Sequence, residues 1–149
     1  MEKTLHFTLM DLIGLLNGTQ FQDLLLRDSG VALDRALFPL LVRIERFGPM
    51  DVRSLANQVG RDHSTVSRHV LKLQSLGLVT LASGADDGRV KLSVVTREGR
   101  KAVQAIGKAR DRLLDRLLQD WTPEDRDNLV RLTDMLVNTL QNAPKPESH

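Results

Sequence analysis

Two short helical patterns separated by a three-residue turn constrain the fold more than any other feature of the chain. The first pattern has apolar residues at helical spacing: Val52, Leu55, Ala56 and Val59. Gly60 follows, where a helix must stop sharply in a conformation that glycine tolerates best. Asp62 can cap the second helix by accepting hydrogen bonds from its first N–H groups. Residues 51–76 therefore predict two short helices joined by a tight turn.

The second helix is predicted to be amphipathic. Its buried face consists of Val66, Val70, Leu73 and Leu76. Its other face presents short polar and basic side chains: His63, Ser64, Thr65, Ser67, Arg68 and Lys72, with Arg61 just before the helix. Short hydroxyls near a helix N-terminus let the helix approach base edges in the major groove, and an arginine can donate two hydrogen bonds to guanine O6 and N7.

We therefore predict a DNA-reading helix. Arg68 is the candidate for guanine, the three hydroxyls contact bases or phosphates, and Lys72 holds a phosphate. The alternative is that this face is only a solvated helix surface, because amphipathic helices are common in soluble proteins.

After Gly77 the pattern changes from helical to extended. Residues 78–81 and 90–95 are β-type runs, and residues 82–88 have the composition of a hairpin loop. Helical patterns flank this segment at 5–16, 33–44, 96–118 and 122–140, and the last begins with Thr122 as N-cap and Pro123 at the first helical position. Pro39 lies within the 33–44 pattern and predicts a kink or an early boundary there. The expected fold is mainly α with a small two-stranded β wing, in the order α-α-α-α-β-β-α-α.

The chain resembles the MarR family of winged helix-turn-helix transcription regulators along nearly its whole length. The resemblance rests on four runs: Leu-Ala-x-x-Val-Gly at 55–60, Ser-Thr-Val-Ser-Arg-His-Val at 64–70, Leu-Gly-Leu-Val at 76–79, and Asp-Gly-Arg at 87–89, followed by Leu92, Thr96 and Gly99. It implies that Arg89 at the wing tip enters the minor groove and that Asp87 orients its guanidinium. Many relatives carry a second arginine at the position of Gly88 and a basic residue at that of Leu81, so this wing is expected to make fewer backbone contacts.

We expect one domain over residues 1–149. Its DNA-binding lobe covers about 33–100, its dimerisation helices about 1–28 and 100–141, and its disordered tail 143–149. An operator with two half-sites needs two recognition helices about 34 Å apart, which predicts a homodimer on a pseudo-palindromic site. The resemblance places the dimer contacts in the N- and C-terminal helices; an intramolecular helical core is the alternative.

The distribution of charge agrees with a DNA-binding face. The whole chain carries a net charge of +2, whereas residues 61–101 contain eight basic and four acidic residues, a net charge of +4. The remainder is therefore net acidic by two charges. A basic segment on one side of a fold is typical of nucleic-acid binding.

Several other classes of protein are not expected. The chain has no cysteine, which excludes disulfides and thiolate zinc sites. His63 and His69 are spaced poorly for joint metal ligation, and no phosphate-binding glycine loop, nucleophile elbow or paired-carboxylate motif occurs. We therefore expect no enzyme, catalytic residue, metal or cofactor. The apolar runs are too short to cross a membrane, and residues 1–17 lack a signal-peptide pattern, which predicts a cytoplasmic protein.

These observations predict a sequence-specific regulator that binds double-stranded DNA, with repression as the default mode. The resemblance further implies release by a small anionic effector, aromatic or phenolic, bound between the dimerisation and DNA-binding lobes. Trp121 either lines such a pocket or is simply packed. The alternatives are an architectural DNA binder without operator specificity and a protein-interaction module; Arg68 and the basic wing argue against the second.

Overall fold

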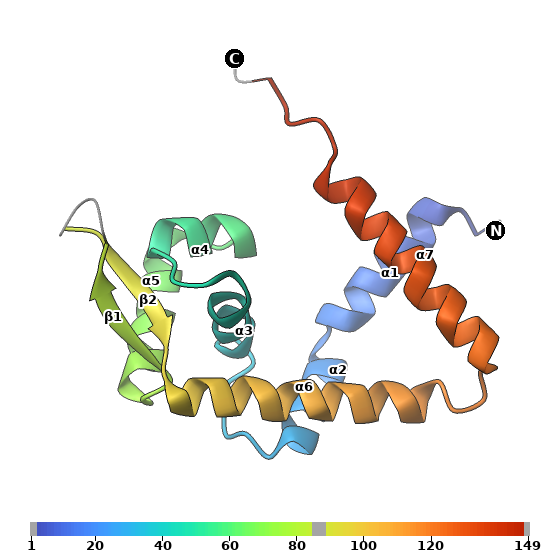
Figure 1. Ribbon diagram of the computed structural model, residues 1–149, viewed down its shortest axis with the longest axis horizontal. Coiled ribbons are helices and arrows are strands. Elements are labelled where there is room, and N and C mark those ends of the chain that lie inside the picture. Colours follow the sequence, from blue (N-terminus) through green and yellow to red (C-terminus); the bar gives the residue numbers. More distant parts are fainter. Residues whose placement is uncertain (1–2, 85–88, 148–149) are drawn as a thin grey trace. The chain divides into compact units, whose positions relative to one another are not determined.

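The structure is a computed structural model that describes residues 3–84 and 89–147 (Figure 1). Its helices and strands follow in the order α1 (Leu5–Asn17), α2 (Thr19–Ser29), α3 (Phe38–Phe47), α4 (Val52–Val59), α5 (His63–Ser75), β1 (Val79–Ser83), β2 (Lys91–Val95), α6 (Arg97–Leu117) and α7 (Pro123–Gln141). The chain divides into two compact units, residues 1–113 and 114–149. The expected mainly helical fold with a two-stranded wing is confirmed.

The structure has one helix more than the sequence pattern predicted. Gly18 takes an extended conformation, with φ −67° and ψ 153°, that ends α1 and at the same time caps the start of α2. α2 carries apolar residues at helical spacing in Phe21, Leu24 and Leu25, of which only Leu25 is fully buried, and the helices predicted from the sequence do not include this segment. Arg112 of α6 donates a hydrogen bond of 3.2 Å to the carbonyl of Asp28 near the end of α2.

The core of the first unit is built around α3. Its buried side chains are Phe38, Leu40, Leu41 and Ile44. Pro39 lies in the first turn of this helix, so it marks the boundary and not a kink. The predicted inner faces of α4 and α5 join the same core through Leu55, Ala56, Val66, Val70 and Leu73. Leu76 was expected on that face, but it lies just after the end of α5 and is 44% exposed.

The two strands form the predicted wing. β1 and β2 pair antiparallel, with Val79 opposite Val95 and Ser83 opposite Lys91. The hairpin is tied to the segment before α4, because Met50 and Ser93 exchange two backbone hydrogen bonds of 3.2 and 2.7 Å. Residues 85–88, which include the predicted wing residue Asp87, lie outside the described residues.

Thr96 and Gly99 fix the start of α6 against the winged lobe. The hydroxyl of Thr96 donates to the carbonyl of Gly77 at 2.6 Å and accepts from the N–H of Gly99 at 3.1 Å. The N–H of Thr96 donates to the carbonyl of Leu78 at 3.0 Å. Gly99 is buried in this contact, so the backbone of α6 approaches the backbone of Leu78 more closely than a larger residue would allow.

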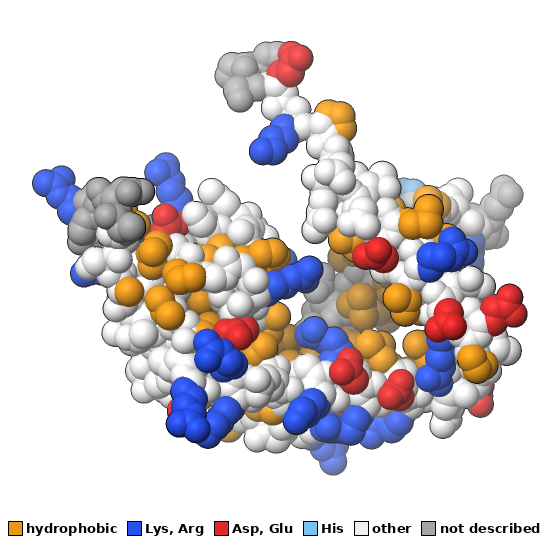
Figure 2. All heavy atoms as spheres, viewed as in Figure 1, with side chains coloured by type: hydrophobic (Ala, Val, Ile, Leu, Met, Phe, Trp, Pro, Cys, Tyr) orange, Lys and Arg blue, Asp and Glu red, His pale blue; other side chains and the backbone are white. Residues whose placement is uncertain are grey.

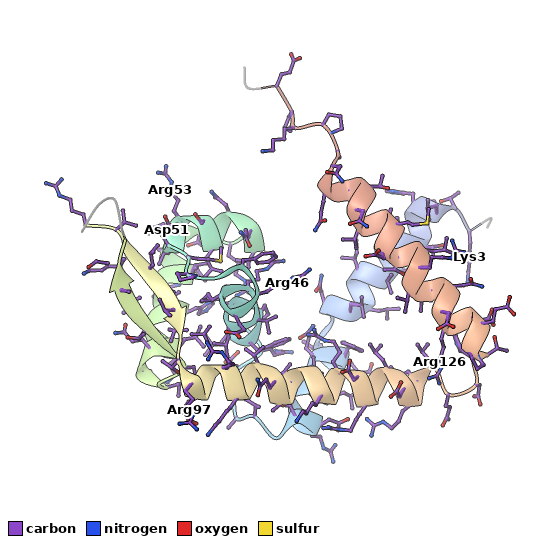
Figure 3. The ribbon with its side chains drawn as sticks, viewed as in Figure 1. Lys3, Arg46, Asp51, Arg53, Arg97 and Arg126 are labelled. Carbon is purple, nitrogen blue, oxygen red and sulfur yellow. The ribbon has the colours of Figure 1, made fainter. Side chains whose placement is uncertain are left out.

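The second unit contains the end of α6 and α7, joined by a turn that Arg126 stabilises. The Arg126 guanidinium donates to the carbonyl of Leu118 at 2.6 and 3.0 Å and pairs with the carboxylate of Asp115 at 3.5 Å (Figure 3). Thr122 caps α7 by accepting from the N–H of Asp125 at 3.1 Å, as predicted. No residue of α7 is fully buried. No helix of the described residues is long and apolar enough to cross a membrane.

Replacing Gly99 by alanine is expected to destabilise the protein. The added methyl would overlap the carbonyl oxygen of Leu78 and approach Cγ1 of Val95 to 2.8 Å, and overpacking of this kind costs about 1–3 kcal/mol. Gly107→Ala, in the same helix with no atom within 4 Å of its Cβ position, is the control and should stabilise by about 0.5–1 kcal/mol. Denaturant titrations measure both free energies of unfolding. Equal values for the two variants would contradict the close approach at Gly99.

Candidate nucleic-acid interface

Capping residues define both ends of α4 and the start of α5. Asp51 caps α4 by accepting from the N–H of Ser54 at 2.7 Å. Gly60 ends α4 in the left-handed region, with φ 65° and ψ 31°, as the sequence predicted. Asp62 then caps α5 by accepting from the N–H of Thr65 at 3.0 Å. Gly60 and Asp62, the caps on either side of the turn, fix the direction in which α5 begins.

The predicted DNA-reading residues lie on the outer side of α5. His63, Ser64, Arg68 and Lys72 are exposed, while Thr65 and Ser67 are half-buried. The opposite side is buried in the core through Val66, Val70 and Leu73. The helix therefore presents hydroxyl and basic groups to solvent along its length. Figure 2 shows further Lys and Arg side chains at the margin of the winged lobe.

The Asp62 carboxylate organises the first turn of α5. One oxygen accepts from the hydroxyl of Ser64 at 2.6 Å, and the other accepts from the hydroxyl of Thr65 at 2.7 Å. The Arg68 guanidinium in turn donates to the Thr65 hydroxyl at 3.4 Å. The hydrogen bonds from Ser64 and then Thr65 hold the pKa of Asp62 well below its usual range, because they stabilise the ionised carboxylate.

Arg61 is engaged within the protein. Its guanidinium donates to the carbonyl of Ala36, at 2.7 Å, and the side chain is half-buried. This hydrogen bond links the turn before α5 to the segment before α3. The structure thus places Arg61 beside the other predicted residues but gives it an internal partner that the sequence did not reveal.

Arg53 of α4 belongs to the same surface, although the sequence analysis did not select it. It projects outward from α4 (Figure 3) and lines a hollow at the N-terminus of α5 together with Asn57 and His63. In the sequence, α4 is distinguished only by its apolar stripe. The signal that could have identified Arg53 is its position on the outer side of the helix that precedes the DNA-reading helix.

The wing places Arg89 next to residues 85–88. Arg89 is exposed and directly follows residue 88 in the chain. Its predicted partner Asp87 lies outside the described residues, so the orientation of Arg89 by Asp87 stays a prediction. Lys91, at the start of β2, donates to the hydroxyl of Ser83 at 3.4 Å across the hairpin.

A second concave site lies in the first unit, where the end of α1 and the start of α2 meet α3 and α4. It has a volume of about 530 Å³ and is lined by Asn17, Thr19, Gln22, Asp34, Arg35, Ala36, Pro39, Arg43, Gln58, Val59 and Arg61. Arg43 donates to the side-chain carbonyl of Gln58 at 3.5 Å. Trp121 belongs to a different hollow, with Asp120, Asp125 and Leu129 in the second unit. Among the described residues, no group of three or more acidic or histidine side chains is placed to hold a metal ion.

Comparisons with known proteins identify relatives that share this fold. The family described as HVO_A0114 matches residues 33–105. Two curated relatives come from Bacillus subtilis strain 168. The HTH-type transcriptional regulator YxaD is 30% identical over 95 residues, 64% of this chain and 66% of its own length. The HTH-type transcriptional regulator YdgJ is 26% identical over 115 residues, 76% of this chain and 68% of its own length. The matched segment of this chain thus spans about two-thirds of each relative's length.

Solved structures cover more of the chain. The crystal structure of MarR superposes with a TM-score of 0.76 at 23% identity, over 91% of this chain and 98% of that one. A MarR family protein from Bacillus stearothermophilus gives a TM-score of 0.74 at 20% identity, over 94% and 100%. At these identities the likeness establishes the fold, and it confirms the resemblance found in the sequence.

Proposed function

Because the chain has the winged helix-turn-helix fold of the MarR family transcription regulators, we propose that it regulates transcription by binding a specific sequence in double-stranded DNA. The observation that carries this proposal is the outer side of α5. Arg68 is exposed there near the short hydroxyl side chains of Ser64, Thr65 and Ser67, and the other side of the helix is buried. A major-groove reader needs this combination of a long donor and short neighbours.

The surrounding charges support binding to a polyanion. Lys72 lies one helical turn beyond Arg68, and Arg53 and His63 border the start of α5. Such groups contact phosphates, which set the register of the helix on the duplex without reading bases. Arg89 of the wing is assigned to the minor groove, where a narrow A·T-rich groove attracts a single arginine.

Two other functions are alternatives, and each predicts a different behaviour toward DNA. An architectural DNA binder would use the same basic groups but would not distinguish one duplex from another. A protein-interaction module would have no use for an exposed arginine and hydroxyl cluster on α5. The exposed Arg68 favours base reading, because a guanidinium can donate two hydrogen bonds to the edge of guanine.

The DNA-binding proposal is tested by fluorescence anisotropy on the promoter region upstream of the protein's own gene, with random duplex as competitor. We expect one dimer per site, poor competition by random DNA and a log–log salt slope near −0.9 per neutralised phosphate. Arg68→Ala should cost about 1–3 kcal/mol of binding free energy and relax base choice at one position.

The control for Arg68→Ala is Arg27→Ala, which removes an exposed arginine of α2 outside the α4–α5 segment. Wild-type affinity in Arg68→Ala would contradict the recognition-helix assignment. Equal binding to promoter and random duplex would favour an architectural role. If neither duplex binds at low salt, the protein-interaction module becomes the better explanation.

We also propose that the protein is a homodimer. The apolar side chains of α1 and α7 are largely exposed: Leu5, Phe7, Met10, Leu12, Ile13, Leu15, Val130, Leu132, Met135 and Leu140 are each 47–71% exposed. No residue of either helix is fully buried. α1 is apolar on nearly all sides, which is typical of a helix buried on several sides. Large exposed apolar surfaces mark interaction sites, and a two-fold dimer supplies the second recognition helix that two half-sites require.

Introducing a charge among the exposed apolar residues of α7 is expected to separate the subunits. Leu132→Asp should shift the sedimenting species from twice the chain mass of 16.7 kDa toward the monomer, because an unpaired carboxylate cannot be buried in an apolar interface without a large cost. Asp127→Ala, which changes an exposed polar residue of the same helix, serves as control. Sedimentation of the wild type as a monomer at micromolar concentration would contradict the dimer.

Repression with release by a small anionic ligand is the mode of regulation that we propose. The concave site beside α3 has the size of a ligand pocket, and its charged lining residues are Arg35, Arg43, Arg61 and a single acid, Asp34. This excess of guanidinium groups favours a carboxylate. Arg61 connects the pocket to the turn before α5, so a ligand there can shift the population of the DNA-binding state if it binds the two states with different affinity.

Salicylate, a phenolic carboxylate, is the probe for this site. We expect millimolar salicylate to raise the apparent Kd for the promoter duplex, and Arg43→Ala to reduce that effect because it removes a guanidinium that lines the pocket. Promoter binding without salicylate should stay near the wild-type value in this variant. Phenol, which has the same ring without the carboxylate, is the ligand control. An unchanged Kd with salicylate would argue against an anionic phenolic effector.

A further inference from the structure

The hydroxyl of Ser64 has a fixed role in the hydrogen bonding of the α5 N-terminus. It lies 2.6 Å from a carboxylate oxygen of Asp62. An ionised carboxylate only accepts hydrogen bonds, and the pKa of Asp62 is lowered, so this group is ionised at neutral pH. The Ser64 hydroxyl must therefore donate its one hydrogen to Asp62.

A serine hydroxyl that has donated its hydrogen can only accept from any further partner. A hydroxyl carries one donor and two acceptor lone pairs. Ser64 is exposed, so its lone pairs remain accessible from solvent. Thr65 is in the same state, since it donates to Asp62 at 2.7 Å and accepts from Arg68 at 3.4 Å, but it is half-buried. Asp62, Ser64 and Thr65 together form an acceptor patch at the start of the DNA-reading helix.

This patch matches few of the groups that DNA presents. Phosphate oxygens, guanine O6 and N7, adenine N7 and thymine O4 are all acceptors, so they cannot hydrogen-bond to a second acceptor. The negative charge of Asp62 further disfavours a phosphate beside Ser64. In the major groove the only donors are the exocyclic amino groups, N6 of adenine and N4 of cytosine.

We propose that Ser64, oriented by Asp62, is a specificity-determining residue that accepts a hydrogen bond from an adenine or cytosine amino group and does not bind phosphate. This inference rests on the proposed DNA-binding function and narrows the role of a side chain that the sequence assigned to bases or phosphates alike. Arg68 supplies donors one turn further along α5, so the same helix reads an amino-bearing base through Ser64 and an acceptor-bearing base through Arg68.

The test compares wild type and Ser64→Ala, both as full-length protein, on a duplex selected from a random pool. Within each half-site, adenine is replaced by purine and cytosine by 2-pyrimidinone, which lack the amino group. At one position the loss of the amino group should weaken wild-type binding roughly 2- to 10-fold, the range for one hydrogen bond. In Ser64→Ala, removing that amino group should weaken DNA binding no more than removing an amino group at a neighbouring position of the half-site does. Ser67→Ala, on the same helix, is the matched control and should respond to that replacement as the wild type does.

Asp62→Gly provides a second variant, because it removes the carboxylate that accepts the hydrogen of Ser64. Glycine is accepted as an N-cap residue with little loss of helix stability, and it leaves the Ser64 hydroxyl free to donate outward. We expect the preference at that one position to broaden from adenine or cytosine toward guanine or thymine. Thermal unfolding of both variants verifies that they are folded.

Two outcomes would overturn the inference. If Ser64→Ala weakens all duplexes equally, with no dependence on any one base, Ser64 contacts a phosphate, while the regulatory function stands. If the wild type binds selected and random duplexes alike, the specific DNA-binding function fails and this inference fails with it. If the effect of Ser64→Ala depends on the amino group of a single base, both the specific DNA-binding function and this inference are supported.

Discussion

The burial of one side of α5 in the core determines most of what this protein presents to a ligand. Val66, Val70 and Leu73 are at most 2% exposed, and each such burial contributes about 1.5–3 kcal/mol. Rotating α5 about its axis would expose this stripe and bury hydroxyl and basic groups without partners. The outward direction of Ser64 and Arg68 is therefore enforced by the apolar side and does not depend on the polar residues themselves. The packing of α4 and β1 against the same helix holds it in place (Figure 1).

Asp62 combines a structural and a recognition role in one carboxylate. As N-cap it satisfies the N–H of Thr65, which has no partner within the helix. The same carboxylate takes the hydrogens of two hydroxyls and so sets what those hydroxyls can recognise. A glycine cap would stabilise the helix nearly as well, but it has no side chain to accept the hydrogens of the Ser64 and Thr65 hydroxyls. The identity of the N-cap residue thus affects which base Ser64 recognises, although Ser64 itself is unchanged.

The helices at the two ends of the chain differ from the winged lobe in whether their large apolar side chains are buried. In the lobe the apolar side chains of α3, α4 and α5 are buried within one chain. In α1 and α7 they are exposed, although they are equally large. A single chain therefore buries the inner side of α5 but leaves the apolar side chains of α1 and α7 exposed. The contacts of Arg126 with Leu118 and Asp115 give α7 a defined start.

The sequence by itself determined the features that depend on neighbouring residues. Gly60, Asp62, Thr122 and Pro123 have the positions that helix ends demand, and the apolar periods of α4 and α5 predicted their buried sides, because capping and amphipathicity act within one or two turns. The tertiary structure decided what depends on distant residues. It bonded Arg61 to Ala36, which lies 25 positions away in the chain. It also brought Arg53 to the edge of the reading surface. No local pattern encodes these contacts, because they arise only when the core has placed separate helices side by side.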